Sequence, residues 1–268
     1  MLERLLITGA AGGLGVLLRD RLGHVARRIR LSDIAPLEDA GGGFEIVPCD
    51  LADRAAVCAL VEGCDGVLHL GGISVEDSFD AILGPNIIGV YNLYEAARAH
   101  GRPRILFASS NHAIGYYRQD QHLTAEMPVQ PDGLYGVSKC YGEAMASLYF
   151  NKFGQETAIV RIGSCRPEPA DYRMLATWMS VEDFVALIER VFTVPRLGCP
   201  IIWGVSDNDR CWWDNSAARY LGWRPKDNAE RFAAAMDARL PLPPPDAAVS
   251  LYQGGVFTED PIIGAEEE

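Results

Sequence analysis

The chain has 268 residues, of which 49% are hydrophobic, and a formal net charge of −12 at pH 7. This length and apolar content suit one large globular domain with a small appended lobe, whereas the negative charge argues against a nucleic-acid or anionic-membrane surface. The longest apolar runs, such as 67–73, fall far short of the roughly 18 residues that a membrane-spanning helix needs.

The first residues and the cysteines indicate a cytoplasmic protein. Glu3 and the glycines from Gly9 onward interrupt the apolar stretch that a signal peptide needs. The seven cysteines are an odd number and form no C-x-x-C pair, which favours reduced thiols. The five histidines show no metal-ligand spacing, so we expect no metal.

Short apolar strands alternate with amphipathic helices through most of the chain. Predicted strands lie at 4–9, 28–33, 44–50, 65–72, 104–110 and 156–163, and predicted helices at 12–23, 53–62, about 80–99 and 135–153. The runs LLIT, VLHL and ILFA are apolar without alternation, as expected for strands that helices cover on both faces. The pattern predicts an α/β fold with a doubly wound parallel sheet of the Rossmann type.

The alternation loosens after the last of these strands. A further helix is predicted at about 181–193, with Ser180 as its candidate cap. The proline-rich stretch 240–246 fits neither a helix nor a central strand, and we expect it to begin a wrapping C-terminal tail. We therefore expect a nucleotide-binding domain at 1–163. Residues 164–268 should form a small substrate-binding region and the tail, partly integrated with that domain.

A glycine-rich turn follows the first predicted strand and opens the first predicted helix. The sequence TGAAGGLG has glycines three residues apart, which allow the backbone to approach a pyrophosphate at the amino end of the helix. The pattern is weak alone, but its place between a strand and a helix strengthens it. The expected pyrophosphate contacts are Gly9, Gly12, Gly13, Leu14 and Gly15.

Asp33 ends the second predicted strand, roughly 20 residues past the glycines, where an acid holds the adenosine ribose hydroxyls of NAD. Its charge would also repel the 2′-phosphate of NADP, and no arginine directly follows it, so we expect NAD as the cofactor. The alternative is that Asp33 only forms the turn at the end of its strand.

Residues that end the next strands should also face the cofactor, because ligands bind at the carboxyl edge of such sheets. Asn86 follows a Gly-Pro pair, so capping a helix and contacting the cofactor are equal alternatives for its side chain. The other expected contacts are Asp50 and Leu51, beside the adenine, and Leu70, Gly71 and Gly72 at the end of the fourth strand.

The stretch YGVSK places Tyr135 and Lys139 four residues apart, on one face of a helix that begins near Tyr135. On an ordinary helix such residues are usually solvated surface neighbours. An adjacent ammonium, however, favours the phenolate, and a phenol activated in this way can act as a base.

TGxxGxxG, Asp33, the serines at 109–110 and YxxxK at 135–139, in this order, resemble the extended short-chain dehydrogenase/reductase superfamily, to which NAD-dependent epimerases and dehydratases belong. Within it the chain is most similar to uronate dehydrogenases. This similarity rests on HLGGISVE at 69–76, NIIGVYNLYEAAR at 86–98, FASSNHAIGYY at 107–117, RIGSCRPEP at 161–169, WWDN at 212–215 and LGWRPKDNAE at 221–230.

The resemblance implies oxidation of D-galacturonate or D-glucuronate at C1 to the aldarolactone, which water opens to the aldaric acid. Tyr135 would be the general base, and hydride would pass to NAD. Lys139 would lower the pKa of the phenol and hold the nicotinamide ribose. Ser110, three residues after Phe107, would hydrogen-bond the reacting oxygen. Cofactor contacts of Tyr135 and Lys139 follow from the same resemblance.

The resemblance also implies a substrate shell of Ser74, Ser110, Asn111, His112, Tyr135, Ser164 and Arg173. Arg173 would clamp the carboxylate with two parallel hydrogen bonds. Alternatively, Arg173 is a loop residue that forms an ion pair with Glu168 or Asp171. The alternative for His112 is a core or solvent-exposed histidine without contact to the substrate. Arg161 is expected to have a structural role.

Two other functions remain open at this point. A nucleotide-sugar epimerase or dehydratase of the same superfamily would need a larger C-terminal lobe than the roughly 100 residues that follow the last predicted strand. A non-catalytic NAD-binding protein usually loses the tyrosine or the lysine, and this chain retains both. The expected partner is the hexuronate, and family habit predicts a homo-oligomer.

Overall fold

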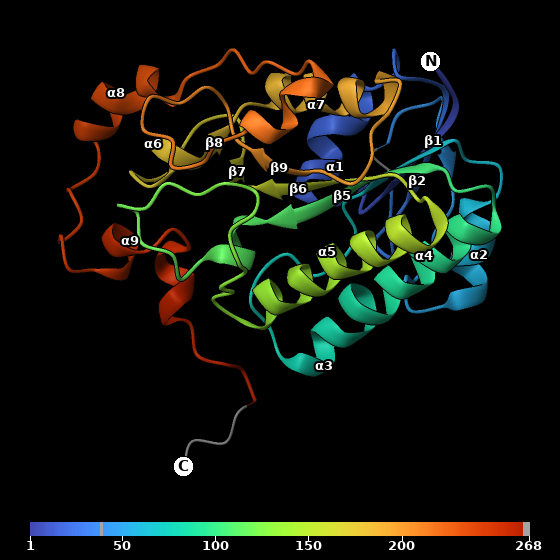
Figure 1. Ribbon diagram of the computed structural model, residues 1–268, viewed down its shortest axis with the longest axis horizontal. Coiled ribbons are helices and arrows are strands. Elements are labelled where there is room, and N and C mark those ends of the chain that lie inside the picture. The colour runs from blue at the N-terminus through green and yellow to red at the C-terminus, as the bar shows by residue number, and fades with distance from the viewer. Residues whose placement is uncertain (38–39, 265–268) are drawn as a thin grey trace.

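The computed structural model describes residues 1–37 and 40–264. Its centre is a parallel sheet of order β3-β2-β1-β4-β5-β6-β9 (Figure 1). The chain runs outward from β1 to β3, returns to β4 and continues outward on the other side, so the predicted doubly wound fold is confirmed. The strands are β1 (Leu2–Thr8), β2 (Ala26–Ser32), β3 (Glu45–Ile46), β4 (Gly66–His69), β5 (Arg104–Ser110), β6 (Thr157–Ile162) and β9 (Ile201–Gly204).

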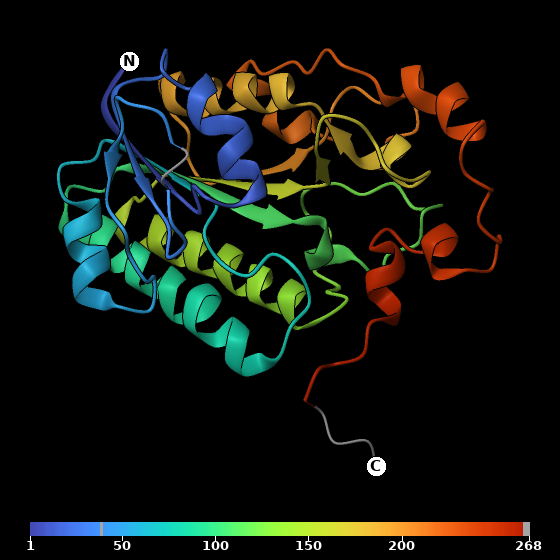
Figure 2. The same cartoon turned by 180° about the vertical axis from the view of Figure 1, so that it is seen from behind.

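Helices cover both faces of this sheet, as Figures 1 and 2 show from opposite sides. One face carries α1 (Gly13–Leu18) and α7 (Val181–Thr193), and the other carries α2 (Arg54–Val61), α4 (Gly89–Ala99) and α5 (Leu134–Phe153).

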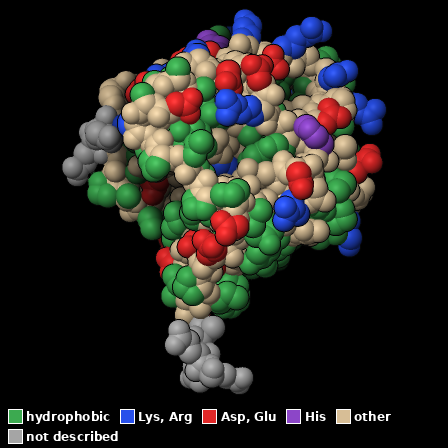
Figure 3. All heavy atoms as spheres, turned by 90° about the vertical axis from the view of Figure 1, so that its left-hand side faces the viewer, with side chains coloured by type: hydrophobic (Ala, Val, Ile, Leu, Met, Phe, Trp, Pro, Cys, Tyr) green, Lys and Arg blue, Asp and Glu red, His purple; other side chains and the backbone are tan. Residues whose placement is uncertain are grey.

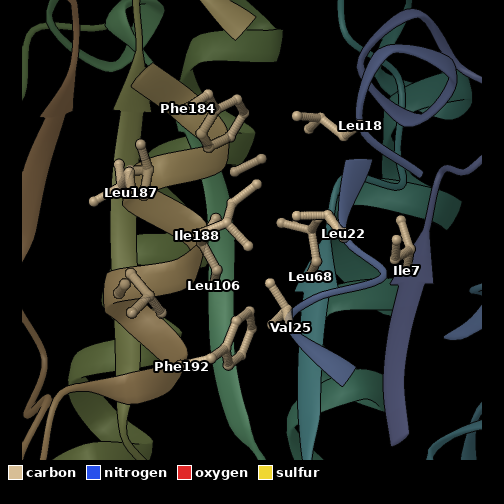
Figure 4. Close-up of a cluster of buried hydrophobic side chains, with 14 of the residues drawn as sticks. Ile7, Leu18, Leu22, Val25, Leu68, Leu106, Phe184, Leu187, Ile188 and Phe192 are labelled. Atoms are coloured by element: carbon tan, nitrogen blue, oxygen red, sulfur yellow. The ribbon is translucent and has the colours of Figure 1, made fainter. Parts of the chain in front are cut away.

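Each face has its own hydrophobic core. Figure 4 shows the first core, where α7 meets α1 and the sheet through Leu18, Phe184, Leu187, Ile188 and Leu106. The second core lies under α2, α4 and α5 and contains Leu60, Leu93, Tyr94, Met145 and Tyr149.

Several predicted boundaries were wrong. The helix expected at 12–23 ends as α1 at Leu18 and tightens into a 3₁₀ turn at Arg19–Arg21. The strand expected at 44–50 is reduced to β3, although Val47 N still donates to Leu31 O at 3.0 Å and Cys49 N to Asp33 O at 3.2 Å. The edge strand β9 was not predicted at all.

The segment expected as one helix at about 80–99 consists of α3 (Phe79–Ile82), a π-helical turn (Leu83–Ile88) and α4. Ser78 caps it, since its Oγ accepts from Ala81 N at 3.3 Å. Asn86 lies within the π turn, so the alternative in which it caps a helix was wrong, and its contact with the cofactor stays a prediction.

The chain after β6 adds a small lobe beside the sheet. It contains β7 (Ser164–Cys165) paired with β8 (Trp178–Met179), the short helices α6 (Met174–Thr177), α8 (Ala233–Asp237) and α9 (Ala248–Leu251), and 3₁₀ turns at Ser216–Leu221, Ala229–Phe232 and Gly255–Glu259. Because α7 and β9 pack into the main sheet, the division into 1–163 and 164–268 stays a prediction. Ser180 caps α7 as predicted, accepting from Asp183 N at 3.0 Å.

The tail returns to the middle of the chain after the prolines. Tyr252 forms a bridge with Arg118, and Gln253 N donates to Tyr117 O at 2.8 Å. On the face that Figure 3 shows, acidic side chains lie among the basic ones. Within 1–37 and 40–264, none of the helices has the length and apolar character needed to cross a bilayer.

Candidate active site

The glycine-rich turn between β1 and α1 has no room for side chains at two of its positions. A Cβ on Gly9, whose φ is +69°, would lie 2.7 Å from Gly71 N, and a Cβ on Gly15 would lie 2.3 Å from Gly9 O. A Cβ on Gly13 would meet no atom within 4 Å. The first amides of α1 have no intrahelical acceptor, as at the start of any helix. Gly12, at the N-cap position, has no side chain that could accept from them. The turn can therefore admit a diphosphate close to its backbone.

Asp33 supports this turn from the end of β2. Its Oδ2 accepts from Ala11 N at 2.9 Å, and its Oδ1 accepts from Ala35 N at 3.0 Å. The turn-forming role that was the alternative is therefore present. Each oxygen of the partly exposed carboxylate keeps a second lone pair, which can accept from a ribose hydroxyl. The contact of Asp33 with NAD stays a prediction.

The other predicted cofactor neighbours lie along the same edge. Asp50 Oδ1 accepts from Ala52 N at 2.8 Å. Leu51 packs closely enough that a Cβ on Gly71 would lie 2.8 Å from Leu51 Cδ1. The remaining two, Leu14 and Leu70, pack against the core on the α1 face.

The loop after β4, residues 70–78, is held in place by Asn86. Asn86 Oδ1 accepts from Ile73 N at 2.8 Å, while Nδ2 donates to Ile73 O at 3.0 Å and to Ser138 Oγ at 2.9 Å. A Cβ on Gly72, whose φ is +128°, would lie 2.6 Å from Asn86 Oδ1. Ser74, next to this anchor, is exposed.

Tyr135, Lys139 and Ser110 meet where α5 begins beside the end of β5. Lys139 Nζ lies 5.4 Å from the centre of the Tyr135 ring and donates to Ala108 O at 2.9 Å. All three side chains are buried. Burial raises the pKa of Tyr135 to about 12, although a hydrogen bond with Ser110 opposes the rise. Burial also lowers the pKa of Lys139 to about 8. The lower phenol pKa that the sequence suggested is therefore outweighed by desolvation.

The neighbouring serine points elsewhere. Ser109 Oγ donates to Glu143 Oε1 at 2.6 Å, and Glu143 pairs with Arg161 at 2.9 and 2.8 Å. Ser110 is thus the serine beside the phenol. The buried Arg161, whose guanidinium lies 5.1 Å from the Trp203 ring, joins α5 to β6 and has the structural role expected of it.

His112 belongs to a buried pair rather than to solvent. Its Nδ1 lies 2.7 Å from Asp132 Oδ2, as in a hydrogen bond from the imidazole to the carboxylate. Its ring centre lies 5.8 Å from that of Tyr135 and 3.9 Å from that of Phe257. A Cβ on Gly254 would lie 1.9 Å from Asp132 Oδ2, so the tail packs directly on this pair.

Arg173 and Asn111 share one acceptor. Arg173 Nη1 donates to Gln253 O at 2.8 Å, and Asn111 Nδ2 donates to the same oxygen at 3.4 Å. Burial lowers the pKa of Arg173, while the charges of Asp171 and Asp132 oppose this. No ion pair joins Arg173 to Glu168 or Asp171 within 4.0 Å in the described chain, so the loop-arginine alternative is not what the structure contains. Ser164 Oγ lies 3.3 Å from Thr177 Oγ1.

Sequence reasoning missed four contributors to this site. Asp132 directly precedes the YxxxK helix in the stretch PDG, and an acid there was the one available signal. Glu76 and the tail residues Gln253 and Phe257 had no signal, because their contacts span 58 to 145 residues of sequence.

A separate cavity of about 640 Å³ lies beyond β9. Its walls include Asn208, Trp213, Arg219 and Arg224, and it contains none of the predicted site residues. Trp213 also packs toward Gly163, where a Cβ would lie 3.0 Å from Trp213 Cζ3. Across the described residues, no group of three or more His, Cys, Asp or Glu side chains has a metal-binding arrangement.

Comparison with known proteins gives matches over nearly the whole chain. The model of the NAD dependent epimerase/dehydratase family matches residues 5–180. The chain is 61% identical to a uronate dehydrogenase of Agrobacterium fabrum over 262 residues, which are 98% of this chain and 99% of that protein. It is 55% identical to a uronate dehydrogenase of Pseudomonas putida over 95% of each chain.

Solved structures give the same result. A mutant uronate dehydrogenase from Agrobacterium tumefaciens complexed with NAD superposes with a TM-score of 0.96 at 60% identity, covering 97% of this chain and 98% of that one. A glucuronic acid dehydrogenase from Chromohalobacter salexigens superposes with a TM-score of 0.97 at 52% identity, covering 99% of this chain and 100% of that one.

Proposed function

Because the chain belongs to the NAD dependent epimerase/dehydratase family and, within it, to the uronate dehydrogenases, we propose that it oxidises a hexuronate at C1 with NAD. The substrate is D-galacturonate or D-glucuronate, and the product is the aldarolactone, which water opens to the aldaric acid. The observation that carries the proposal is the buried group of Tyr135, Lys139 and Ser110 at the end of β5, on the sheet edge that also carries the glycine turn, in a chain 61% identical to a uronate dehydrogenase.

The residues present fit NAD. The space above Gly13 and the uncapped start of α1 suit a diphosphate, and the partly exposed Asp33 carboxylate beside the same turn suits ribose hydroxyls. The nicotinamide end belongs near Gly71, Gly72 and Asn86. When bound, NAD supplies the acceptor for the hydride that leaves C1.

The chain's own residues handle the proton. Tyr135 takes the proton of the C1 hydroxyl, and Ser110 holds the same oxygen by hydrogen bonding. Burial alone would leave the phenol protonated, since it raises the pKa to about 12. Lys139, whose pKa is about 8, is mostly charged at neutral pH, and its ammonium 5.4 Å from the ring centre favours the phenolate.

The sugar is held by directional groups, because each of its oxygens needs a partner. The Asp132 carboxylate keeps His112 Nδ1 as a donor, which leaves Nε2 for the sugar. The Arg173 guanidinium clamps the C6 carboxylate, because its Nη1 donates to Gln253 O and no other side-chain hydrogen bond of Arg173 is found among residues 1–37 and 40–264. The remaining members of the shell are Ser74, Asn111 and Ser164.

The test mixes the purified protein with NAD⁺ and galacturonate and follows NADH absorbance. A steady rise that depends on the uronate is expected, and no rise with either galacturonate or glucuronate would remove the proposal. A nucleotide-sugar epimerase would instead retain NAD through purification and convert a nucleotide sugar without net NADH formation.

We also propose that the enzyme works in the cytoplasm as a homo-oligomer, with residues 1–163 as the nucleotide-binding domain. Cell fractionation and analytical ultracentrifugation test the first two statements. Limited proteolysis near Gly163 tests the third.

A further inference from the structure

The helix that carries Tyr135 has no cap of its own. Gly133 occupies the N-cap position of α5 and has no side chain to accept from the first amides. Glu76, from the loop after β4, takes this place: Oε1 accepts from Leu134 N at 2.8 Å and Oε2 accepts from Tyr135 N at 2.9 Å. One carboxylate therefore pairs with both amides, including that of Tyr135 itself.

The fit between the carboxylate and the helix start is tight. A Cβ on Gly133 would lie 2.3 Å from Glu76 Oε2, so a larger residue at 133 would displace the carboxylate. A negative charge at the positive end of a helix adds to the two hydrogen bonds. These interactions hold the loop that carries Glu76 at a fixed distance from the start of α5.

The same loop is tied to α5 at a second point. Asn86 joins Ile73 to Ser138, one turn into the helix. Ser74 and Val75 lie between this anchor and Glu76. The segment expected to face the nicotinamide and the sugar is thus held to α5 on both sides, and its position and that of Tyr135 depend on one another.

We propose that Glu76 is a positioning residue, whose carboxylate couples the cofactor-facing and substrate-facing loop 72–76 to the place of the Tyr135 phenol. The inference rests on the proposed function and deepens it. A displacement of about 1 Å at a reacting group can lower a rate by roughly a hundredfold. Loss of this link should therefore affect turnover more than it affects cofactor binding.

The experiment compares Glu76→Ala and Glu76→Gln with the control Asp80→Ala. Asp80 is an exposed acid of the first turn of α3, four residues from Glu76, and no hydrogen bond or ion pair of its side chain is found within the described chain. Each alanine variant removes one negative charge from the same segment. The readouts are kcat, KM for the uronate, Kd for NAD, melting temperature and amide hydrogen exchange of the cofactor-free protein.

We expect Glu76→Ala to lower kcat by roughly ten- to hundredfold with a smaller change in the Kd for NAD, and Asp80→Ala to stay within about twofold of the parent. Exchange at Leu134 and Tyr135 and across 72–76 should accelerate only in the Glu76 variants. Glu76→Gln keeps one acceptor oxygen, so its kcat should fall between those of the parent and Glu76→Ala. If the alanine variant folds poorly, the glutamine variant still tests the inference.

Two results would overturn the inference. If Glu76→Ala loses thermal stability but the folded enzyme keeps the parental kcat, the carboxylate is only a helix cap. If exchange at Leu134 and Tyr135 does not change, the link does not exist in solution. If the parent protein fails to oxidise uronates, the proposed function itself is refuted. The hydrogen-exchange comparison does not depend on activity, so it still tests the link between Glu76 and α5.

Discussion

Replacing Arg173 tests whether the enzyme recognises a uronate through its carboxylate. Arg173 is half-buried, one N–H is used by Gln253 O, and no carboxylate of the described chain pairs with it within 4.0 Å. The rest of its planar donor fork is available for a carboxylate supplied by the substrate.

The magnitude follows from the pairing that Arg173→Ala removes. A substrate carboxylate left without its charged partner loses roughly 1.5–3 kcal/mol, which is about a ten- to hundredfold fall in kcat/KM for galacturonate. Most of the fall should appear in KM, because the clamp binds ground state and transition state alike. Arg173→Lys should recover only part, since it supplies charge without the fork.

The same arginine also holds the tail through Gln253, so the assay must separate the two roles. Galactose, which lacks the carboxylate, is the matched control substrate, and the Kd for NAD is the control for the fold. Any activity on galactose should barely change in Arg173→Ala. Equal losses for galacturonate and galactose would mean that the variant disturbs the tail and that the carboxylate is held elsewhere.

Other substitutions test the remaining roles. Tyr135→Phe should keep the fold and NAD binding while kcat falls by about 10²–10⁴, the range for lost acid–base catalysis, and near-parental turnover would remove the assigned base. Asp33→Ala should weaken NAD binding and reduce discrimination against NADP. If the ratio of kcat/KM with NAD to kcat/KM with NADP does not change, the only role of Asp33 is to support the turn. Glu143→Ala should lower the free energy of unfolding by roughly 3–5 kcal/mol, because the buried Arg161 loses its carboxylate. Chemical denaturation measures this, and a loss below about 1 kcal/mol would contradict it.

The parallel sheet could be predicted because its strands are continuous apolar runs between glycine-rich turns and helices. Leu5, Leu6 and Ile7 of β1 are fully buried, as strands covered on both faces must be. The edge strand β9 escaped prediction, because its short run at 201–204 follows Pro200 and lies in the region where the alternation had already loosened.

Asn86 shows why a local signal can mislead. Proline is common at the start of a helix, so the sequence after the Gly-Pro pair suggested a helix opening at Asn86 and made Asn86 a candidate cap. Here the helix has begun at Phe79 and widens into a π turn, where Gly89 N donates to Gly84 O. Pro85 has no amide hydrogen to donate, and a wide turn accommodates it without ending the helix. Asn86 is left inside the turn, where its amide can reach the loop after β4.

Candidate side chains for the site could be named from the sequence, but the contacts that hold them could not. Asn111 and Arg173, which lie 62 residues apart, both donate to the backbone oxygen of Gln253. Every residue type offers the same backbone carbonyl, so no residue type at 253 signals this contact. The side chain of Gln253 fixes that carbonyl instead, accepting from Trp213 Nε1 at 2.8 Å and donating to Gln121 O at 2.9 Å. The tail therefore contacts the predicted substrate residues Asn111 and Arg173 through its backbone, and only the folded chain reveals a contact of this kind.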